Sequence, residues 1–137
     1  MPKVLISDAM DSIAEKILTS NQIDVDIKTD FNTDELKDKI SEYDGLIIRS
    51  ATKVTKEIIE SAKILKIIGR AGAGVDNIDL VSAKEKKIIV MNTPGGNTNA
   101  TAEHTLALLM SLSRKISKAD VSTHKGCLLY TSPSPRD

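Results

Sequence analysis

Short apolar runs alternate along this chain with longer segments in which apolar residues recur at helical spacing. This alternation is typical of parallel strands joined by helical crossovers. The sequence therefore predicts an α/β fold, with about five strands forming an open, doubly wound parallel sheet of flavodoxin-like order. The expected strands are residues 3–7, 23–28 (an edge strand), 45–49, 64–69 and 88–91.

The helical segments combine periodic apolar positions with start signals. Asn32, followed three residues later by Glu35, is the signature of a capped helix start, and Thr55 is the expected cap of the next helix. A helix is also expected over residues 80–86, and the longest one runs from about residue 100 to residue 121. The periodic apolar positions are Ile13, Ile17, Leu18, Leu36, Ile40, Ile58, Ile59, Leu106, Leu109, Met110 and Ile116.

Residues 127–137 break this pattern. They contain no periodic element, and Pro133 and Pro135 exclude a regular helix or a central strand. We expect this tail to be disordered. It resembles translated adapter or out-of-frame sequence, so the genuine chain is expected to stop near Gly126.

Composition excludes several classes of function. Lys plus Arg equals Asp plus Glu at 19 each, and the chain has one Phe, two Tyr and no Trp, so neither nucleic acid nor an acidic membrane is an expected partner. The single Cys127 excludes an internal disulfide and a cysteine metal cluster. The N-terminal sequence has no signal-peptide hydrophobic region and no apolar run could span a bilayer, so a cytoplasmic protein is expected.

Candidate chemistry gathers where the predicted strands end. In an open α/β sheet, ligands bind beyond the carboxyl ends of the strands, which places Arg49-Ser50, residues 70–75 and residues 92–97 around one crevice. Arginine forks suit carboxylate and phosphate oxygens. The competing interpretation is that these arginines form ion pairs with acidic neighbours such as Asp44 or Asp76.

The sequence Gly72-Ala73-Gly74 after a strand invites comparison with a dinucleotide fingerprint. The third glycine is absent, because position 77 is Asn, and the following strand ends at Met91-Asn92 without an acidic residue for a ribose hydroxyl. Glycines here can adopt backbone angles closed to other residues and expose N–H groups to an anion, with Asn77 and Asp79 marking the next helix start. A tight turn that needs small residues is the alternative, for this segment and for residues 92–97.

Other polar residues give weaker signals. Neither His104 nor His124 has a Ser, Cys or carboxylate at a spacing that implies a catalytic pair, and no ligands cluster for a metal. Asp8, at the end of the first strand, resembles the acidic pocket of phosphoacceptor receiver domains, but Arg49 occupies the position of their phosphorylated Asp.

Three motifs together resemble the D-isomer-specific 2-hydroxyacid dehydrogenases. They are residues 46–54, 69–79 and 90–97, the last followed by Ala102-Glu103, and the resemblance covers residues 1 to about 126 in order. It implies an NAD-dependent oxidoreductase, a homo-oligomer when complete, acting on a small phosphorylated 2-hydroxy acid. Residues 1–97 would be the substrate-binding domain, and residues 98–126 a connecting helix leading to a Rossmann domain that this chain lacks.

The resemblance also implies roles for individual residues. Arg49 and Ser50 would contact the substrate, and Arg70 would bind its phosphate. The roles implied for the others are a carboxylate site at the N–H groups around Gly74 and Val75, a cleft-lining position at Asn97, and an approach to the nicotinamide at Ala73.

The family's catalytic His, Glu and Arg have no counterpart in this chain, so the polypeptide is expected to be inactive by itself. Three alternatives stay open. The first is a family member of the glycerate or glyoxylate reductase type, for which less positive charge would suffice. The others are a non-catalytic ligand-sensing or corepressor-like protein on this fold, and a stand-alone flavodoxin-like binding module.

Overall fold

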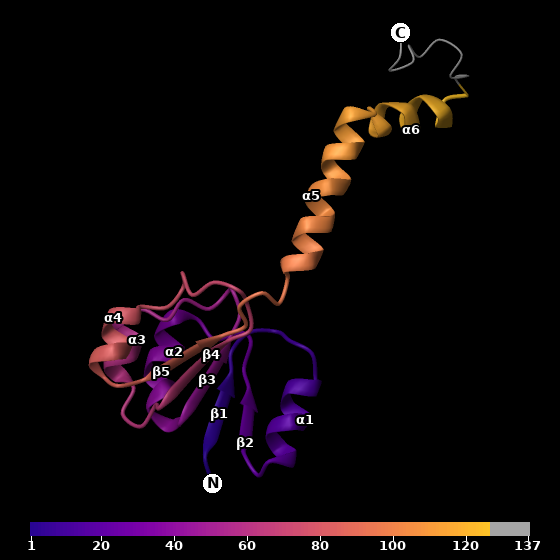
Figure 1. The fold of residues 1–137 in the computed structure, drawn as a ribbon. Helices are drawn as coiled ribbons and strands as arrows, with labels where there is room; N and C mark the ends of the chain where they lie inside the picture. The colour runs from indigo at the N-terminus through magenta and orange to yellow at the C-terminus, as the bar shows by residue number, and fades with distance from the viewer. Residues whose placement is uncertain (127–137) are drawn as a thin grey trace. The chain divides into compact units, whose positions relative to one another are not determined.

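The structure, a computed structural model, describes residues 1–126 (Figure 1). The expected tail at residues 127–137 lies outside the described residues. The strands are β1 (Lys3–Ile6), β2 (Asp24–Ile27), β3 (Gly45–Ile48), β4 (Ile67–Arg70) and β5 (Ile89–Asn92). The helices are α1 (Ile13–Ser20), α2 (Thr33–Lys39), α3 (Lys56–Ser61), α4 (Leu80–Glu85), α5 (Thr98–Ser113) and α6 (Ile116–His124), with a 3₁₀ turn at Ile40–Glu42.

The five strands pair in parallel in the order β2-β1-β3-β4-β5. This is the flavodoxin-like order, and it confirms the predicted α/β class with β2 at one edge. The chain divides into two compact units, Met1–Gly96 and the residues from Asn97 onward. The sheet belongs entirely to the first unit.

The main core lies on one face of the sheet. Leu5, Leu46 and Ile68 are level with one another in β1, β3 and β4, and all three are buried on this face. Figure 1 shows α2, α3 and α4 on one side of the sheet and α1 on the other. The helices on the core side contribute the buried residues Leu36, Ile58, Ile59 and Ala83, and the adjoining 3₁₀ turn contributes Ile40.

The start signals are confirmed for two helices and corrected for a third. The Asn32 side chain accepts from the Glu35 N–H at 2.9 Å, while the Glu35 carboxylate accepts from the Asn32 N–H at 2.9 Å. Asp79 caps α4 by accepting from the N–H of Ser82 at 2.9 Å. Thr55 precedes α3 as expected, but its side chain makes no capping hydrogen bond.

Most predicted boundaries lie within one or two residues of those observed, and two predictions differ more. β4 begins at Ile67 rather than at residue 64, because its pairing with β3 starts at Ile67 and Gly45, the residue where β3 begins. The predicted helix over residues 100–121 is interrupted between α5 and α6 by Lys115, which adopts the left-handed conformation with φ 51°. No Gly or Pro marks that position, so apolar periodicity alone could not locate the break.

Candidate functional site

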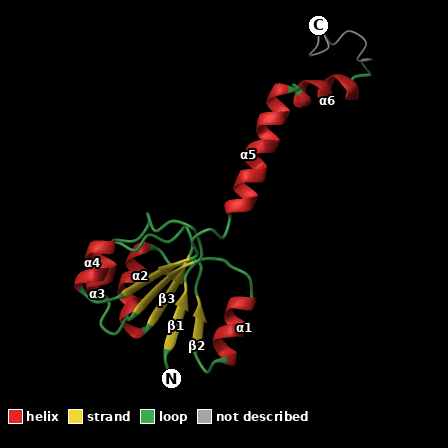
Figure 2. Cartoon of the chain, viewed as in Figure 1, coloured by secondary structure: helices red, strands yellow, loops and turns green. Residues whose placement is uncertain are grey.

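The loops that follow β3, β4 and β5 form the candidate site, and Figure 2 shows the loops gathered at the end of the sheet to which the strands point. Ile48, Arg70 and Asn92 are level in the register of β3, β4 and β5. Arg49 follows Ile48 directly, so parallel pairing brings two arginines from distant parts of the sequence to one edge.

Arg70 lies against the loop after β3. Its Nε donates to the carbonyl oxygen of Arg49 at 3.3 Å, and its Nη1 is 3.4 Å from Oδ1 of Asp76. The Arg70 side chain is 11% exposed, whereas that of Asp76 is 84% exposed. The ion-pair interpretation is therefore correct for Arg70 and Asp76, while Asp44 pairs instead with Lys66 at 2.8 Å.

Arg49 is exposed and lies beside the turn after β1. Its Nη1 donates to the carbonyl oxygen of Ala9 at 3.0 Å, which ties the guanidinium to the residue that follows Asp8. Ser50 and Ala51 are exposed at the outer part of the same loop. A pocket of about 450 Å³ lies beside this loop and is lined by Ser50, Lys53, Val54, Thr55, Asp76, Asn77, Ile78 and Asp79.

The glycines of the Gly72–Gly74 turn serve a different purpose from the expected one. Neither glycine has a positive φ, so the special conformational freedom of glycine is not what the turn uses. A Cβ at Gly74 would lie 2.9 Å from Arg70 Nη1 and 2.9 Å from Asp76 Oδ1, so the absent side chain leaves room for this ion pair. The turn leads on to α4, which begins at Leu80 as predicted.

The main chain of this turn still presents N–H groups. Ala71 N–H and Gly72 N–H donate to the carbonyl oxygens of Ile48 and Arg70, respectively. The N–H groups of Ala73, Gly74 and Val75 find no acceptor among the described residues. Unpaired N–H groups beside a guanidinium form a surface that attracts anions. Arg49, Ser50, Gly74 and Val75 lie on adjoining loops of one unit, with Arg70 at the end of β4 and Ala73 between the two glycines.

The segment after β5 is a turn that supports the glycine loop. The Asn92 side chain donates to the carbonyl oxygen of Ala73 at 2.8 Å, and Thr93 N–H donates to that of Gly72 at 3.0 Å. Gly96 N–H donates to Thr93 at 3.3 Å across Pro94-Gly95, and Gly95 has φ 79°, as in a type II turn. Asn97 begins the second unit, so its place relative to the arginines stays a prediction.

Two polar side chains that sequence reasoning gave other meanings hold the loop after β3. Asp8 is 5% exposed and accepts from the N–H groups of Arg49 at 2.5 Å and Thr52 at 3.1 Å. Asn77 does not start a helix; its Nδ2 donates to the carbonyl oxygens of Arg49 at 2.8 Å and Thr52 at 2.6 Å. Burial opposes ionisation of Asp8, but hydrogen bonds from Thr52 and Arg49 outweigh it and lower the pKa of this carboxyl group.

Several other chemistries find no support in residues 1–126. No group of three or more His, Cys, Asp or Glu side chains there could hold a metal ion. β5 ends at Asn92 with no acidic residue for a ribose, so the described part has no dinucleotide-binding turn. His124 does have a carboxylate near it, with Nδ1 3.4 Å from Asp120 Oδ1, but both side chains are exposed on α6.

The described helices include none with the length and apolar character needed to cross a membrane.

Comparison with known proteins agrees with this fold. The catalytic domain of the family "D-isomer specific 2-hydroxyacid dehydrogenase" matches residues 4–132. The D-3-phosphoglycerate dehydrogenase of Synechocystis sp. is 50% identical over 122 residues, which are 89% of this chain and 22% of that protein. The Archaeoglobus fulgidus protein of the same name is 45% identical over 124 residues, or 90% of this chain and 24% of its own length.

A crystal structure of NAD⁺-bound 3-phosphoglycerate dehydrogenase from Entamoeba histolytica superposes with a TM-score of 0.69 at 34% identity, covering 80% of this chain and 38% of the other. The chain thus spans about a quarter of the length of the curated relatives that it matches. On this evidence the chain belongs to the D-isomer specific 2-hydroxyacid dehydrogenases, a family of NAD-dependent oxidoreductases.

Proposed function

We propose that this chain is the substrate-binding part of an NAD-dependent enzyme that oxidises 3-phosphoglycerate to 3-phosphohydroxypyruvate, the first step of serine biosynthesis. The observation that carries the proposal is the position of Arg70 beside the unpaired N–H groups of Ala73, Gly74 and Val75, next to the main chain of Arg49. The names of the relatives at 45% and 50% identity support the same substrate.

The charge of the site suits this substrate. A molecule with one carboxylate and one phosphate carries about three negative charges near neutral pH. Arg70 would bind the phosphate, Arg49 and Ser50 would contact the substrate, and the N–H groups of Gly74 and Val75 would donate to the carboxylate. Charge-assisted bonds of this kind are about twice as strong as bonds between neutral groups.

Two further roles belong to the complete protein. Asn97 would line the cleft, and Ala73 would lie near the nicotinamide end of NAD. Residues 1–126 form no nucleotide-binding turn, so the part proposed for this chain is binding and orientation of the substrate anion. We expect no reduction of NAD when the 137-residue chain is mixed with 3-phosphoglycerate, and turnover by the purified chain would contradict this assignment.

One observation favours a second candidate, an unphosphorylated 2-hydroxy acid such as glycerate. Arg70 is 11% exposed and already contacts both Asp76 and the carbonyl oxygen of Arg49. Binding a phosphate would require Arg70 to present its remaining N–H groups or to exchange Asp76 for the ligand. A substrate with only a carboxylate would not need that exchange.

Titration of the isotopically labelled chain, followed by NMR, separates the two candidates. We expect 3-phosphoglycerate to shift the amide signals of Ser50, Gly74 and Val75 and to bind more tightly than D-glycerate. Substitution Arg70→Ala should raise the dissociation constant for 3-phosphoglycerate by about 10- to 100-fold and change that for D-glycerate little.

The matched control is Lys66→Ala, which removes a cation that pairs with Asp44 immediately before β3, away from the loops of the site. It should leave both dissociation constants unchanged. Equal losses for the two ligands in Arg70→Ala would favour the unphosphorylated substrate, and absence of binding by the unsubstituted chain would remove the proposed site.

A further inference from the structure

Residues Arg49–Thr52 form a four-residue loop, here called the arginine loop, whose two ends are held by the same two side chains. The N–H groups of Arg49 and Thr52 both donate to the Asp8 carboxylate, at 2.5 and 3.1 Å. The carbonyl oxygens of the same two residues both accept from Asn77 Nδ2, at 2.8 and 2.6 Å. One side chain therefore binds both terminal donors of the loop, and the other binds both terminal acceptors.

Asp8 and Asn77 together are here called the clamp. Asp8, which accepts the hydrogen bonds, is held in place beside the sheet. Asp8 lies just beyond β1 and is 5% exposed. The Thr52 hydroxyl donates to Asp8 Oδ1 at 2.6 Å and lies 3.0 Å from the hydroxyl of Ser7, which is itself buried. Hydrogen bonds are directional, so the bonds around the Asp8 carboxylate restrict its orientation. They restrict the conformation of the arginine loop in the same way.

Asn77, which donates the hydrogen bonds, is held in place by a short parallel bridge between Val54 and Ile78. Val54 N–H donates to the carbonyl oxygen of Asn77 at 2.8 Å, and Asp79 N–H donates to that of Val54 at 3.0 Å. Asn77 Oδ1 is buried and has no donor among the described residues, so the amide acts here through its N–H groups. A buried acceptor without a partner is costly, and the two hydrogen bonds from Nδ2 offset that cost.

Both arginines of the site depend on this clamp. The carbonyl oxygen of Arg49 that accepts from Asn77 also accepts from Arg70 Nε. The Arg49 guanidinium bonds to Ala9, the residue next to Asp8. A change in the position of Asp8 or Asn77 would therefore move the main chain of Arg49, which carries one guanidinium and accepts a hydrogen bond from the other.

We propose that Asp8 and Asn77 are positioning residues, which contact no substrate but set the affinity of the site for its anion by holding the arginine loop between them. This inference rests on the proposed function, since it concerns the same anion site.

The direction in which Asp8→Asn changes the affinity for the anion distinguishes a positioning role from a purely electrostatic one. Asp8 remains ionised near neutral pH, because hydrogen bonds from Thr52 and Arg49 overcome the effect of burial and lower its pKa. A negative charge near an anion site weakens binding by Coulomb repulsion. If Asp8 acted through its charge, Asp8→Asn would tighten binding; if it acts through the loop, the same substitution should weaken binding, because an amide NH₂ then faces N–H donors.

The test compares dissociation constants for 3-phosphoglycerate by NMR titration of the labelled chain, at temperatures where circular dichroism shows each variant folded. We expect Asp8→Asn and Asn77→Ala each to raise the dissociation constant by about 10-fold or more. Without ligand, amide hydrogen exchange at Arg49 and Thr52 should become faster in Asp8→Asn. Thr52→Val removes the hydroxyl that bonds to Asp8 and should weaken binding, while Thr52→Ser retains it and should restore affinity.

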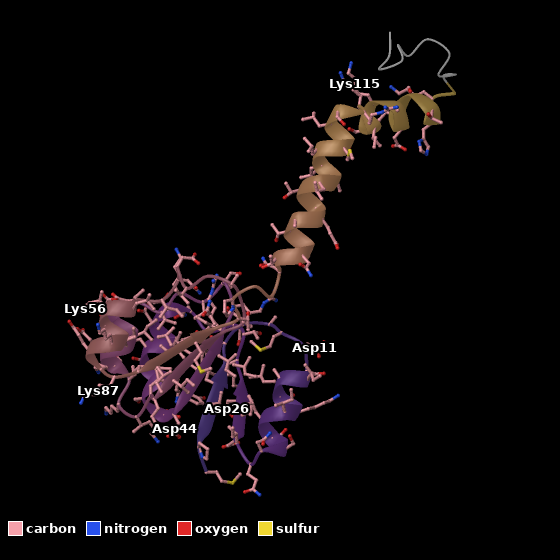
Figure 3. All side chains as sticks on the ribbon, in the orientation of Figure 1. Asp11, Asp26, Asp44, Lys56, Lys87 and Lys115 are labelled. Carbon is pink, nitrogen blue, oxygen red and sulfur yellow. The ribbon has the colours of Figure 1, made fainter. Side chains whose placement is uncertain are left out.

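Asp26→Asn is the matched control. Asp26 is also a bonded aspartate of the sheet, but its partners Lys3 and Tyr43 precede or begin strands, at the end away from the arginine loop. Figure 3 labels Asp26 near Asp44, the residue just before β3. Asp26→Asn should lower stability and leave the dissociation constant within about twofold of the unsubstituted value.

The outcomes separate this inference from the function on which it rests. Binding by the unsubstituted chain with unchanged or tighter binding in Asp8→Asn would overturn the positioning role and leave the substrate assignment intact. Equal weakening in Asp8→Asn and Asp26→Asn would show a general effect of stability and would also overturn it. No binding by the unsubstituted chain would remove the proposed function and this inference together.

Discussion

Gly74→Ala and Gly72→Ala should have different effects, although the two glycines look equivalent in the sequence. A Cβ at Gly74 would lie 2.9 Å from Arg70 Nη1 and 2.9 Å from Asp76 Oδ1. Non-bonded contacts to carbon are favourable near 3.5–4.0 Å, so each of these atoms must move by about 0.5 Å or more. At Gly72 the nearest atoms, Arg70 Cζ and Nη1, would lie at 3.5 Å, which is an ordinary contact.

The cost to stability should be small in both variants. The atoms near position 74 are the ends of flexible side chains, and Asp76 is 84% exposed, so loss of this ion pair costs about 0–1 kcal/mol. Replacing glycine by alanine where φ is not positive also stabilises by about 0.4–1 kcal/mol through the unfolded state. The two effects nearly cancel, and the free energy of unfolding should change by less than about 1 kcal/mol, within about 8 °C in Tm for a unit of this size.

Anion binding should separate the two variants. In Gly74→Ala the displaced Arg70 guanidinium should lose a charge-assisted bond to the ligand, which raises the dissociation constant for 3-phosphoglycerate by about 10-fold or more. Gly72→Ala should bind as the unsubstituted chain does. The assay is the same NMR titration, with urea unfolding to verify stability. Equal binding by the two variants, or a large loss of stability confined to Gly74→Ala, would refute this account of the turn.

Three other predictions concern the first unit. Tyr43→Phe removes a buried hydroxyl that donates to Asp26 at 2.8 Å and should lower the free energy of unfolding by about 1–2 kcal/mol in urea; an unchanged midpoint would contradict a contribution from this bond. The pKa of Asp26 is lowered by Lys3 and Tyr43, and that of Asp8 is lowered by its hydrogen bonds despite burial. Both carboxylates therefore stabilise the fold above about pH 4, and this stabilisation is lost as pH falls through their pKa values in the folded state. Urea titrations from pH 6 to about pH 3 should show this loss, which should be smaller in Asp8→Asn and Asp26→Asn. Asn32→Ala should cost about 1 kcal/mol because Asn32 caps α2, whereas Thr55→Ala, where the side chain makes no cap bond, should cost less; equal costs would argue against the cap.

Much of the fold is predictable because buried parallel strands leave a strong signal. The apolar runs of β1 and β3, and the capped start of α2, identify the elements and their order. The break at Lys115 leaves no such signal, since nothing in Ser113-Arg114-Lys115 forbids a helix. The bonding of Asp26 leaves no such signal either, because its partners Tyr43 and Lys3 lie elsewhere in the sequence.

The site divides in the same way. Arg49 and Arg70 are predictable because each follows or ends a strand, and parallel strands end together. Asp8 and Asn77 are not, because their partners are distant in the chain: Asp8 and Arg49 are 41 positions apart, and Asn77 and Arg49 are 28 apart. A polar residue at a strand end reads equally well as a ligand, a helix cap or a scaffold. Only the observed partners distinguish these roles.

The clamp around the arginine loop also limits how this part of the protein can be redesigned. Substrate preference in a binding loop is commonly altered by transplanting the loop from a relative. Here the four residues 49–52 take their conformation from Asp8 and Asn77, which lie on two other connections of the sheet. A transplant confined to these four residues would place a foreign loop between an Asp8 and an Asn77 whose positions suit the original loop. The smallest exchangeable module is therefore discontinuous, because it consists of the loop together with Asp8 and Asn77.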